Sequence, residues 1–212
     1  MKQKEIFKKS EGDAWFRRNQ AVLAERDWSR DPICLQVAEL VETGKTAKVL
    51  EIGCGDGSRL THLRDRLNCE VAGIDPSSEA ISVATSKGLS ANVGTADSLP
   101  YAGGVFDIVI FGFCLYLCDD NDLFRIACEA DRVLSENGWL LLLDFEAKAP
   151  TYRSYHHREG IRSRKMDYKQ MFLWHPAYTL SGYRKFHHET LQWTDERDEW
   201  VSLSCMRKSI RT

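Results

Sequence analysis

The stretch VLEIGCGDG, residues 49–57, joins a short apolar run to three glycines at alternate positions. An apolar run of this length is typical of a buried strand, and Ser58 opens a helical pattern directly after it. Glycines between a strand and a helix form a tight turn that exposes backbone N–H groups to a ligand. The stretch therefore predicts a strand–turn–helix unit that holds a ligand against bare backbone.

The segments that follow repeat this alternation. We expect strands at residues 48–52, 70–74, 91–94, 106–113 and 139–145, and helices at residues 58–67, 78–87 and 119–134. Two later segments, 183–193 and 199–207, have the pattern of strands joined as a hairpin through residues 194–198. The alternation predicts a parallel sheet with helices on both faces. Its right-handed crossovers place the carboxyl ends of the strands along one ligand-binding edge.

The first 45 residues have a polar, helical pattern. Asp13 is expected to cap one helix, and Asp31 followed by Pro32 marks the start of another. Gly44 is expected to end that second helix. We therefore predict a helical N-terminal segment before the first strand.

The composition is that of a folded domain in water. A chain of 212 residues, 43% hydrophobic and 28% charged, is long enough for one domain with a full core. A net charge of −2 argues against binding nucleic acid over the whole surface. The seven cysteines lack disulfide or zinc spacing, and the sequence shows neither a signal-peptide pattern nor a membrane-length apolar run. We expect a cytoplasmic protein with no metal and no membrane contact.

The spacing of the glycines distinguishes between classes of ligand. A dinucleotide turn requires G-x-G-x-x-G, and here the third position of that pattern is Ser58, which disfavours a nicotinamide-dependent dehydrogenase. The actual spacing is G-x-G-x-G, with Glu51 inside the strand before it. Two acids follow at the ends of later strands, Asp75 after the second and Asp97 after the third.

These features together resemble a known family. The pattern Glu51-x-Gly53-x-Gly55-x-Gly57 resembles motif I of the class I S-adenosylmethionine-dependent methyltransferases. Asp75 and the segments 94–100, 106–109 and 132–139 resemble the family's later motifs in the expected order. The resemblance covers about residues 40–145 and, in outline, the last two strands. It implies S-adenosyl-L-methionine as cofactor.

The cofactor's chemistry agrees with the residue types. Its ribose hydroxyls are donors suited to Asp75, and its adenine amino group needs an acceptor such as Asp97. Its cationic amino group favours a nearby carboxylate, from Glu51 or Asp56. Taken singly, each acid has a structural alternative, such as a turn or a cap. The expected cofactor-binding residues are Glu51, Gly53, Cys54, Gly55, Gly57, Asp75, Pro76, Asp97, Ser98 and Phe113, with Trp15 and Arg18 from the N-terminal segment.

The resemblance sharpens the expected fold. We predict a Rossmann-like, doubly wound α/β fold with a mostly parallel seven-stranded sheet, an antiparallel C-terminal strand and helices on both faces. Residues 1–212 are expected to form a single domain. It would comprise an N-terminal helical lid (1–45), a cofactor-binding core (46–145), a substrate-cover insertion (146–182) and a C-terminal strand pair (183–212).

Two regions are candidates for the chemistry. Tyr116 falls after the fourth strand, in a segment that borders the methyl group in the family, and it either orients a substrate or packs under the next helix. The segment 146–190 holds nine lysines and arginines against four acids, interleaved with aromatic residues. It is either a solvated basic surface or a substrate cover. His156, His157 and His175 are the candidate general bases. His187 and His188 fit a strand, so at most one of them would point inward.

The predicted function is methyl transfer to a small molecule. A basic, aromatic cover favours an oxygen of an anionic metabolite or a sugar in a biosynthetic pathway as the acceptor. RNA or protein methylation is one alternative, although the segment after the fourth strand lacks the Asn/Asp-Pro-Pro-Tyr pattern of many amino-methylating relatives. A non-catalytic, cofactor-binding partner subunit is another. A monomer and a homodimer both remain open.

Overall fold

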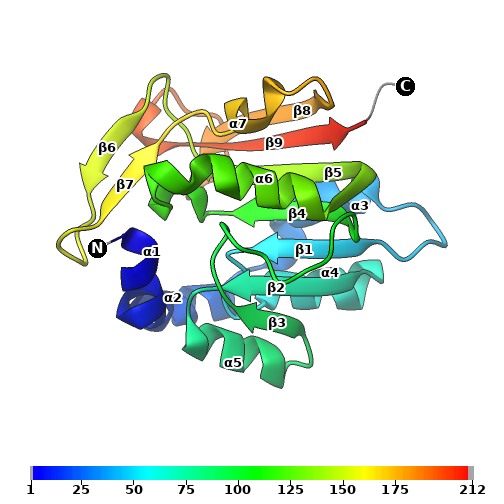
Figure 1. Ribbon diagram of the computed structural model, residues 1–212, viewed down its shortest axis with the longest axis horizontal. Helices are drawn as coiled ribbons and strands as arrows, with labels where there is room; N and C mark the ends of the chain where they lie inside the picture. Colours follow the sequence, from blue (N-terminus) through cyan, green and yellow to red (C-terminus); the bar gives the residue numbers. More distant parts are fainter. Residues whose placement is uncertain (1, 210–212) are drawn as a thin grey trace.

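The computed structural model describes residues 2–209, which form a seven-stranded sheet flanked by helices (Figure 1). The strand order is β3-β2-β1-β4-β5-β9-β8, and every neighbouring pair is parallel except those that involve β9. The predicted mostly parallel sheet with an antiparallel C-terminal strand is confirmed. The strands are β1 (Lys48–Ile52), β2 (Glu70–Asp75), β3 (Ser90–Val93), β4 (Phe106–Gly112), β5 (Leu134–Phe145), β8 (Tyr178–His187) and β9 (Trp200–Lys208).

The helices begin and end where local chemistry favours it. Asp31 caps its helix as predicted, since its carboxylate accepts the N–H groups of Ile33 and Cys34 at 3.0 and 3.2 Å. That helix ends at Leu40, earlier than the expected Gly44. The helices are α1 (Gln3–Ile6), α2 (Gly12–Glu25), α3 (Pro32–Leu40), α4 (Ser58–Leu67), α5 (Ser78–Ser86), α6 (Leu123–Val133) and α7 (Gln170–Leu173), with a π-helical stretch at Phe7–Glu11 between α1 and α2.

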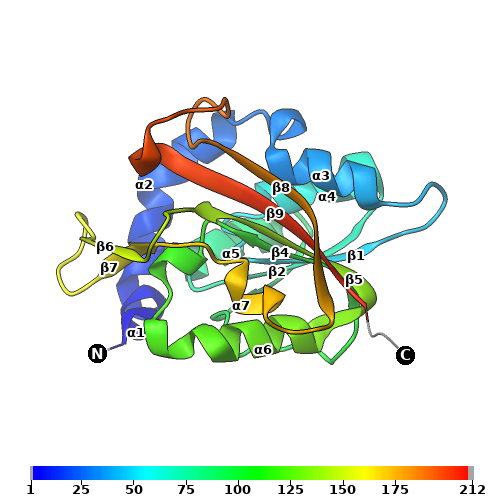
Figure 2. The same ribbon diagram turned by 90° about the horizontal axis from the view of Figure 1, so that it is seen from above.

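The two faces of the sheet carry separate apolar cores. Side chains from α3, α4 and α5, such as Ile33, Leu63 and Ile81, pack with one set of strand residues. Side chains from α6 and α7, such as Ile126 and Phe172, pack with the other set. Figure 2 shows these two layers on opposite sides of the sheet. The central parallel strands β1, β2 and β4 are buried on both faces, which explains why each contains a continuous apolar run.

The N-terminal helical segment crosses the edge where the parallel strands end. Figures 1 and 2 place α1 and α2 along this edge, near the strand carboxyl ends. Asp13, expected to cap its own helix, lies in the first turn of α2 and caps α5 instead. Its carboxylate accepts the Ser77 hydroxyl at 2.7 Å and the Glu79 N–H at 3.0 Å. This cap fastens α2 to the core beside the edge of the sheet.

Several boundaries differ from the sequence prediction. Residues 134–138, expected as the end of a helix and a turn, begin β5, which pairs with β4 through an irregularity near Phe106. β8 starts at Tyr178 and ends at His187, so the connection to β9 is longer than the predicted turn. Residues 151–165, where no regular pattern was found, form a hairpin of β6 (Thr151–Ser154) and β7 (Arg162–Lys165).

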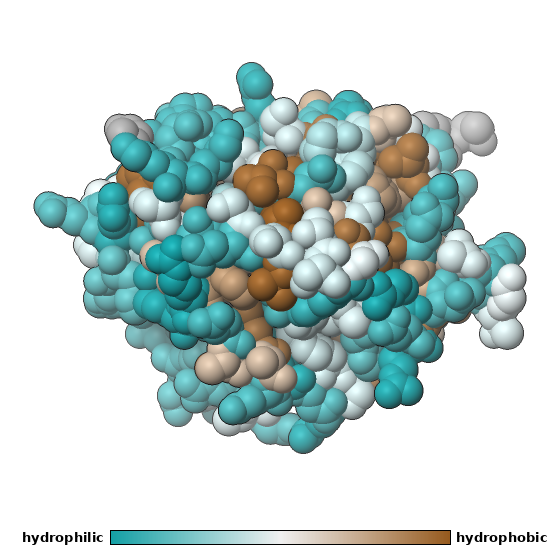
Figure 3. Space-filling view, turned by 90° about the horizontal axis from the view of Figure 1, so that it is seen from below, coloured by the Kyte–Doolittle hydropathy of each residue, from teal (hydrophilic) through white to brown (hydrophobic). Residues whose placement is uncertain are grey.

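The surface is mostly hydrophilic. On the face seen from below, apolar side chains gather near the middle and hydrophilic ones surround them (Figure 3). Val93 of the edge strand β3 is half exposed. Within residues 2–209, no helix combines the length and the apolar character needed to cross a membrane.

Candidate active site

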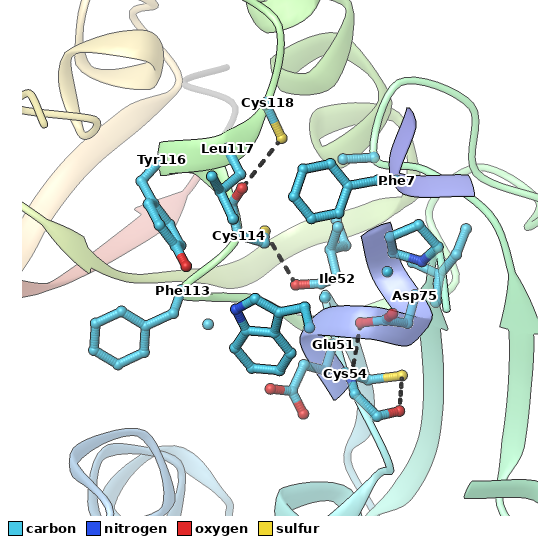
Figure 4. A pocket seen from close by; sticks show the side chains of 18 of the residues that line it. Phe7, Glu51, Ile52, Cys54, Asp75, Phe113, Cys114, Tyr116, Leu117 and Cys118 are labelled. Atoms are coloured by element: carbon cyan, nitrogen blue, oxygen red, sulfur yellow. Dashed lines mark hydrogen bonds between the residues drawn. The ribbon is translucent and has the colours of Figure 1, made fainter. Parts of the chain in front are cut away.

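A cavity of about 420 Å³ lies between the carboxyl ends of β1, β2 and β4 and the N-terminal helical segment. Its lining comes from the glycine turn after β1, the segment after β4, α2, and the loops after β2 and β3. In Figure 4, Asp75, Cys54 and Glu51 lie to one side of the view, and Phe113 and Tyr116 lie to the other. The cavity therefore has a polar half at the glycine turn and an aromatic half beyond it.

The glycine turn brings backbone close to the cavity. Gly53 has a φ of +80°, and a side chain there would place its Cβ 2.6 Å from the Cβ of Cys114. Only glycine fits this conformation and this approach. The expectation of bare N–H groups is wrong, however. Gly53 and Cys54 donate to the Ile74 carbonyl at 2.8 and 3.1 Å, and Gly55 donates to Asp75 at 3.0 Å. A turn with these donors already bonded suits a ligand without a pyrophosphate.

Glu51 belongs to a buried ion-pair network. Arg59 donates to its Oε1 and also contacts both carboxylate oxygens of Asp31, at 3.1 and 3.3 Å. Burial raises the pKa of Glu51 to about 7, although the charge of Arg59 opposes the shift. Within residues 2–209 the second oxygen, Oε2, is buried without a hydrogen-bond partner. A cationic group in the cavity would satisfy that oxygen.

Asp75 is fixed at the end of β2. Its Oδ2 accepts the N–H of Gly55 at 3.0 Å, and its Oδ1 accepts the N–H of Ser77 at 2.8 Å. Burial raises the pKa of its carboxyl group to about 6, against the lowering effect of these two bonds. Each oxygen keeps a further lone pair, so the carboxylate can accept from two ligand hydroxyls.

Asp97 lies at the far end of the polar half and is held by the N-terminal segment. Lys4 of α1 pairs with Asp97 and lies 2.8 Å from Oδ2 of Asp122. Burial opposes ionisation, but Lys4 lowers the pKa of Asp97. The main-chain N–H groups of Gln3 and Lys4 also bond the Asp119 carboxylate, at 2.9 and 3.0 Å. The start of the chain is thus fastened over this end of the cavity.

The segment after β4 supplies the aromatic half. Phe113 has a φ of +55°, a conformation rare outside glycine, and its N–H donates to the Leu143 carbonyl at 2.8 Å. Buried Asp144 holds the next residues, because its carboxylate accepts the Leu115 N–H at 2.8 Å. Burial raises the pKa of Asp144 to about 7, even though backbone donors including that of Tyr116 lower it. Asp144 thereby positions the turn that carries Tyr116.

Four rings form a continuous aromatic wall, which we define as Phe113, Tyr116, Phe145 and His188. The ring of Phe145 lies 5.4 Å from that of Phe113, 5.0 Å from that of Tyr116 and 5.9 Å from that of His188, between centroids. All four residues line the cavity. The tilted and edge-on angles between them are those that aromatic pairs prefer.

Two tryptophans of the N-terminal segment line the same cavity. Trp15 is on α2, where its carbonyl accepts the Asn19 amide at 2.8 Å. Trp28 is on the 3₁₀ turn that follows, with the guanidinium groups of Arg26 and Arg59 at 5.0 and 5.3 Å from its ring. These cation–π contacts link Trp28 to the buried ion-pair network.

Most of the predicted cofactor-binding residues meet at this cavity. Tyr116, predicted for the chemistry, also lines it. The predicted cofactor residues in the lining are Trp15, Glu51, Gly53, Cys54, Gly55, Asp75, Pro76, Asp97 and Phe113.

Three predicted cofactor residues lie outside the lining. Gly57 is the left-handed N-cap of α4, with a φ of +70°, and serves the turn. Ser98 is exposed in the loop after β3. Arg18 points to another part of the fold, where it donates to Glu11 at 2.6 Å and to the Tyr155 hydroxyl at 3.0 Å.

The three candidate bases also lie outside the lining. His156 and His157 are exposed in the loop between β6 and β7, and the ring of His157 lies 5.3 Å from that of Tyr155. His175 follows α7, where its Nδ1 accepts the Ala177 N–H at 3.2 Å. Within residues 2–209, His188 is the only member of segment 146–190 in the lining. The local sequence had no signal for this, because β8 ends at His187 and the longer connection to β9 sets the direction of His188.

Comparisons with known proteins agree with this geometry. A family model described as "Methyltransferase domain" matches residues 50–142. Over this stretch, which is less than half of its length, the chain is similar to methyltransferase domains. The match runs from the glycine turn to β5, so it includes the polar half of the cavity.

A sequence relative is Ajmaline N-methyltransferase of Rauvolfia serpentina, 29% identical over 107 residues, which are 47% of this chain and 36% of that protein. Norajmaline N-methyltransferase of the same plant is 33% identical over 38% of this chain and 30% of its own length. The matches therefore span about a third of the length of these curated relatives.

Solved structures share the fold of the methyltransferase domain. A SAM-dependent methyltransferase from Methanosarcina mazei aligns with a TM-score of 0.68 at 19% identity, covering 85% of this chain and 98% of that one. The 1,6-didemethyltoxoflavin-N1-methyltransferase of Burkholderia thailandensis, solved with bound 1,6-didemethyltoxoflavin and S-adenosylhomocysteine, aligns with a TM-score of 0.73 at 15% identity, covering 95% of this chain and 87% of that one.

Proposed function

We propose that this chain transfers a methyl group from S-adenosylmethionine to a small-molecule acceptor. The observation that carries the proposal is the division of one cavity into a polar half around the glycine turn and an aromatic half beyond it. Two ligands that meet end to end need such a division, because methyl transfer is a direct displacement between them.

The polar half fits S-adenosylmethionine. Asp75 would accept the ribose hydroxyls, Asp97 the adenine amino group, and the unpartnered Oε2 of Glu51 the cationic amino group. Six acids and three basic side chains line the whole cavity, which favours a positively charged ligand. When bound, S-adenosylmethionine supplies an activated methyl group on its sulfonium. The chain's own residues bind and orient it and exclude water.

The charged residues that line the cavity indicate which charge the acceptor can carry. The basic cover expected to favour an anionic or sugar-like acceptor does not line the cavity within residues 2–209. Several of its cations pair elsewhere: Arg153 lies 2.7 Å from Asp198, and Lys185 lies 2.7 Å from Glu146. An acidic, aromatic lining instead supports an acceptor without negative charge.

The direct experiment is titration calorimetry with S-adenosylmethionine and S-adenosylhomocysteine, followed by transfer of a labelled methyl group to candidate acceptors. Saturable binding to the wild-type chain is the expected result, and no binding at millimolar ligand would contradict the proposal. Binding without turnover against every acceptor class would instead support the non-catalytic partner subunit. RNA binding that weakens steeply with salt would support the RNA alternative.

A further inference from the structure

We propose that the acceptor is a flat aromatic molecule with an ionisable N–H or O–H group, and that His188 accepts its proton. The inference rests on the proposed function, since it concerns the other half of the same cavity. It depends on the aromatic wall, on the tryptophans of the N-terminal segment and on the position of His188.

The lining selects for a flat ring system. Phe113, Tyr116 and Phe145 come from the core of the fold, and Trp15 and Trp28 come from the N-terminal segment. Ring faces and edges from two separate parts of the chain give a planar ligand contact on more than one side. A saturated ring of the same size would lose the stacking, and an anion would meet the acidic field of the cavity.

His188 is the histidine in this lining within residues 2–209. Its Nδ1 lies 2.8 Å from Oε2 of Glu199, at ion-pair distance though without the alignment of a hydrogen bond. Its main-chain N–H donates to the Glu199 carbonyl at 3.1 Å, which ties the two residues together. The other charged or titratable neighbours are His187, whose ring stacks at 5.2 Å, and Glu189, 3.7 Å from Nε2.

This arrangement assigns a role to each residue. The acceptor's N–H or O–H proton passes to the imidazole of His188, and its electron pair forms the new bond to the methyl carbon. The bond from that carbon to sulfur breaks, and its electron pair stays on sulfur as S-adenosylhomocysteine. Glu199 does not line the cavity, so it is a positioning residue that stabilises the protonated imidazole.

The first test measures binding. With the chain saturated by S-adenosylhomocysteine, tryptophan quenching and calorimetry would be recorded for 2-naphthol, benzimidazole and 7-hydroxycoumarin. Decahydro-2-naphthol and glucose 6-phosphate are the saturated and anionic counterparts. We expect the planar compounds to bind at least about tenfold more tightly, and Trp15→Leu to remove most of that preference while Trp174→Leu, at an exposed site, does not.

The outcomes separate the two proposals. If S-adenosylhomocysteine binds but no planar compound binds, or if the saturated and anionic compounds bind equally well, the acceptor inference is overturned and the proposed function stands. If S-adenosylhomocysteine itself does not bind, the proposed function fails.

The second test concerns the proton. For the panel compounds that bind, methyl transfer at saturating acceptor should fall about 100- to 10,000-fold in His188→Gln, so that weaker binding cannot account for the loss. His175→Gln, outside the cavity, is the matched control. Glu199→Gln should lower kcat at unchanged KM, and Glu199→Asp should restore part of it. Full turnover in His188→Gln, or no methylation of any bound panel compound, would overturn the role of His188.

The same assay tests whether His188 binds a metal ion instead of accepting a proton. Ligand atoms of His187, His188 and Glu199 lie within 4.8 Å of one another, close enough to share a cation. The base role predicts turnover that EDTA leaves unchanged. Loss of turnover in EDTA that Zn²⁺ or Mg²⁺ restores would overturn the base role in favour of a metal.

Discussion

Replacing Asp75 with asparagine tests the ribose end of the cavity. The carboxylate accepts Gly55 N–H at 3.0 Å and Ser77 N–H at 2.8 Å, so both oxygens are already directed by backbone donors. In asparagine the amide nitrogen replaces one oxygen, and a donor would then face a donor. Losing one hydrogen bond between a hydroxyl and a charged acceptor costs about 1.5–3 kcal/mol. We therefore expect affinity for S-adenosylhomocysteine to fall about 10- to 150-fold.

Calorimetry at pH 8 is the assay, because the carboxyl group of Asp75, with a pKa of about 6, is ionised there. Asp107→Asn is the matched control. Asp107 also accepts a backbone N–H, from Lys48 at 2.8 Å, but it lies at the amino end of β4, away from the cavity. Thermal unfolding of both variants would show that the fold is intact. An Asp75→Asn variant that binds within twofold of the wild type would refute the ribose assignment.

Three further predictions concern the same site. Gly53→Ala should reduce the free energy of unfolding by about 1–3 kcal/mol in chemical denaturation, because the new Cβ would lie 2.6 Å from that of Cys114 at a φ of +80°; an unchanged midpoint would contradict this. Arg59→Met should cost about 3–5 kcal/mol of unfolding free energy, because it leaves buried Glu51 without its cation and buried Asp31 with Arg26 alone. Arg64→Met, at a partly exposed pair, should cost under about 1 kcal/mol. Because the pKa of Glu51 is raised to about 7 and a bound cation favours its ionised form, affinity for S-adenosylhomocysteine should fall as the pH drops from 8 to 6; calorimetry showing constant affinity would argue against that contact.

The sequence predicted strands and helices well where residues within one segment determine its structure. Strands such as 106–112 are apolar on both faces, and helix 58–67 follows a glycine turn, so periodicity and turn residues agree. The hairpin at 151–165 gave no such signal, because β6 is exposed along its whole length and has no alternation between faces. The start of β5 was missed because Leu134 already pairs with Phe106 of β4, while Asn137, with a φ of +60°, and Gly138 lie in the irregularity between that pair and the pair of Ile108 with Trp139.

The residues of the candidate site likewise fall into those that the sequence could predict and those that it could not. The polar half lies on the consecutive elements β1, α4, β2, α5 and β3, so residues such as Glu51, Asp75 and Asp97 could be found from their spacing together with the family resemblance. Lys4 and His188 could not, because contacts with Asp97 and Phe145, far away in the sequence, bring them to the cavity. The segment 146–190 holds five histidines, of which three were predicted as bases, and only tertiary structure shows that His188, not one of those three, is in the lining.

A crystal structure of the complex with S-adenosylhomocysteine tests the central claim most directly. The account predicts that the ribose hydroxyls bond Asp75, the adenine amino group lies at Asp97 and the amino group of the homocysteine part meets Oε2 of Glu51. The sulfur should then face the aromatic wall. A ligand bound elsewhere on the chain, or one whose sulfur points away from Tyr116 and His188, would contradict it.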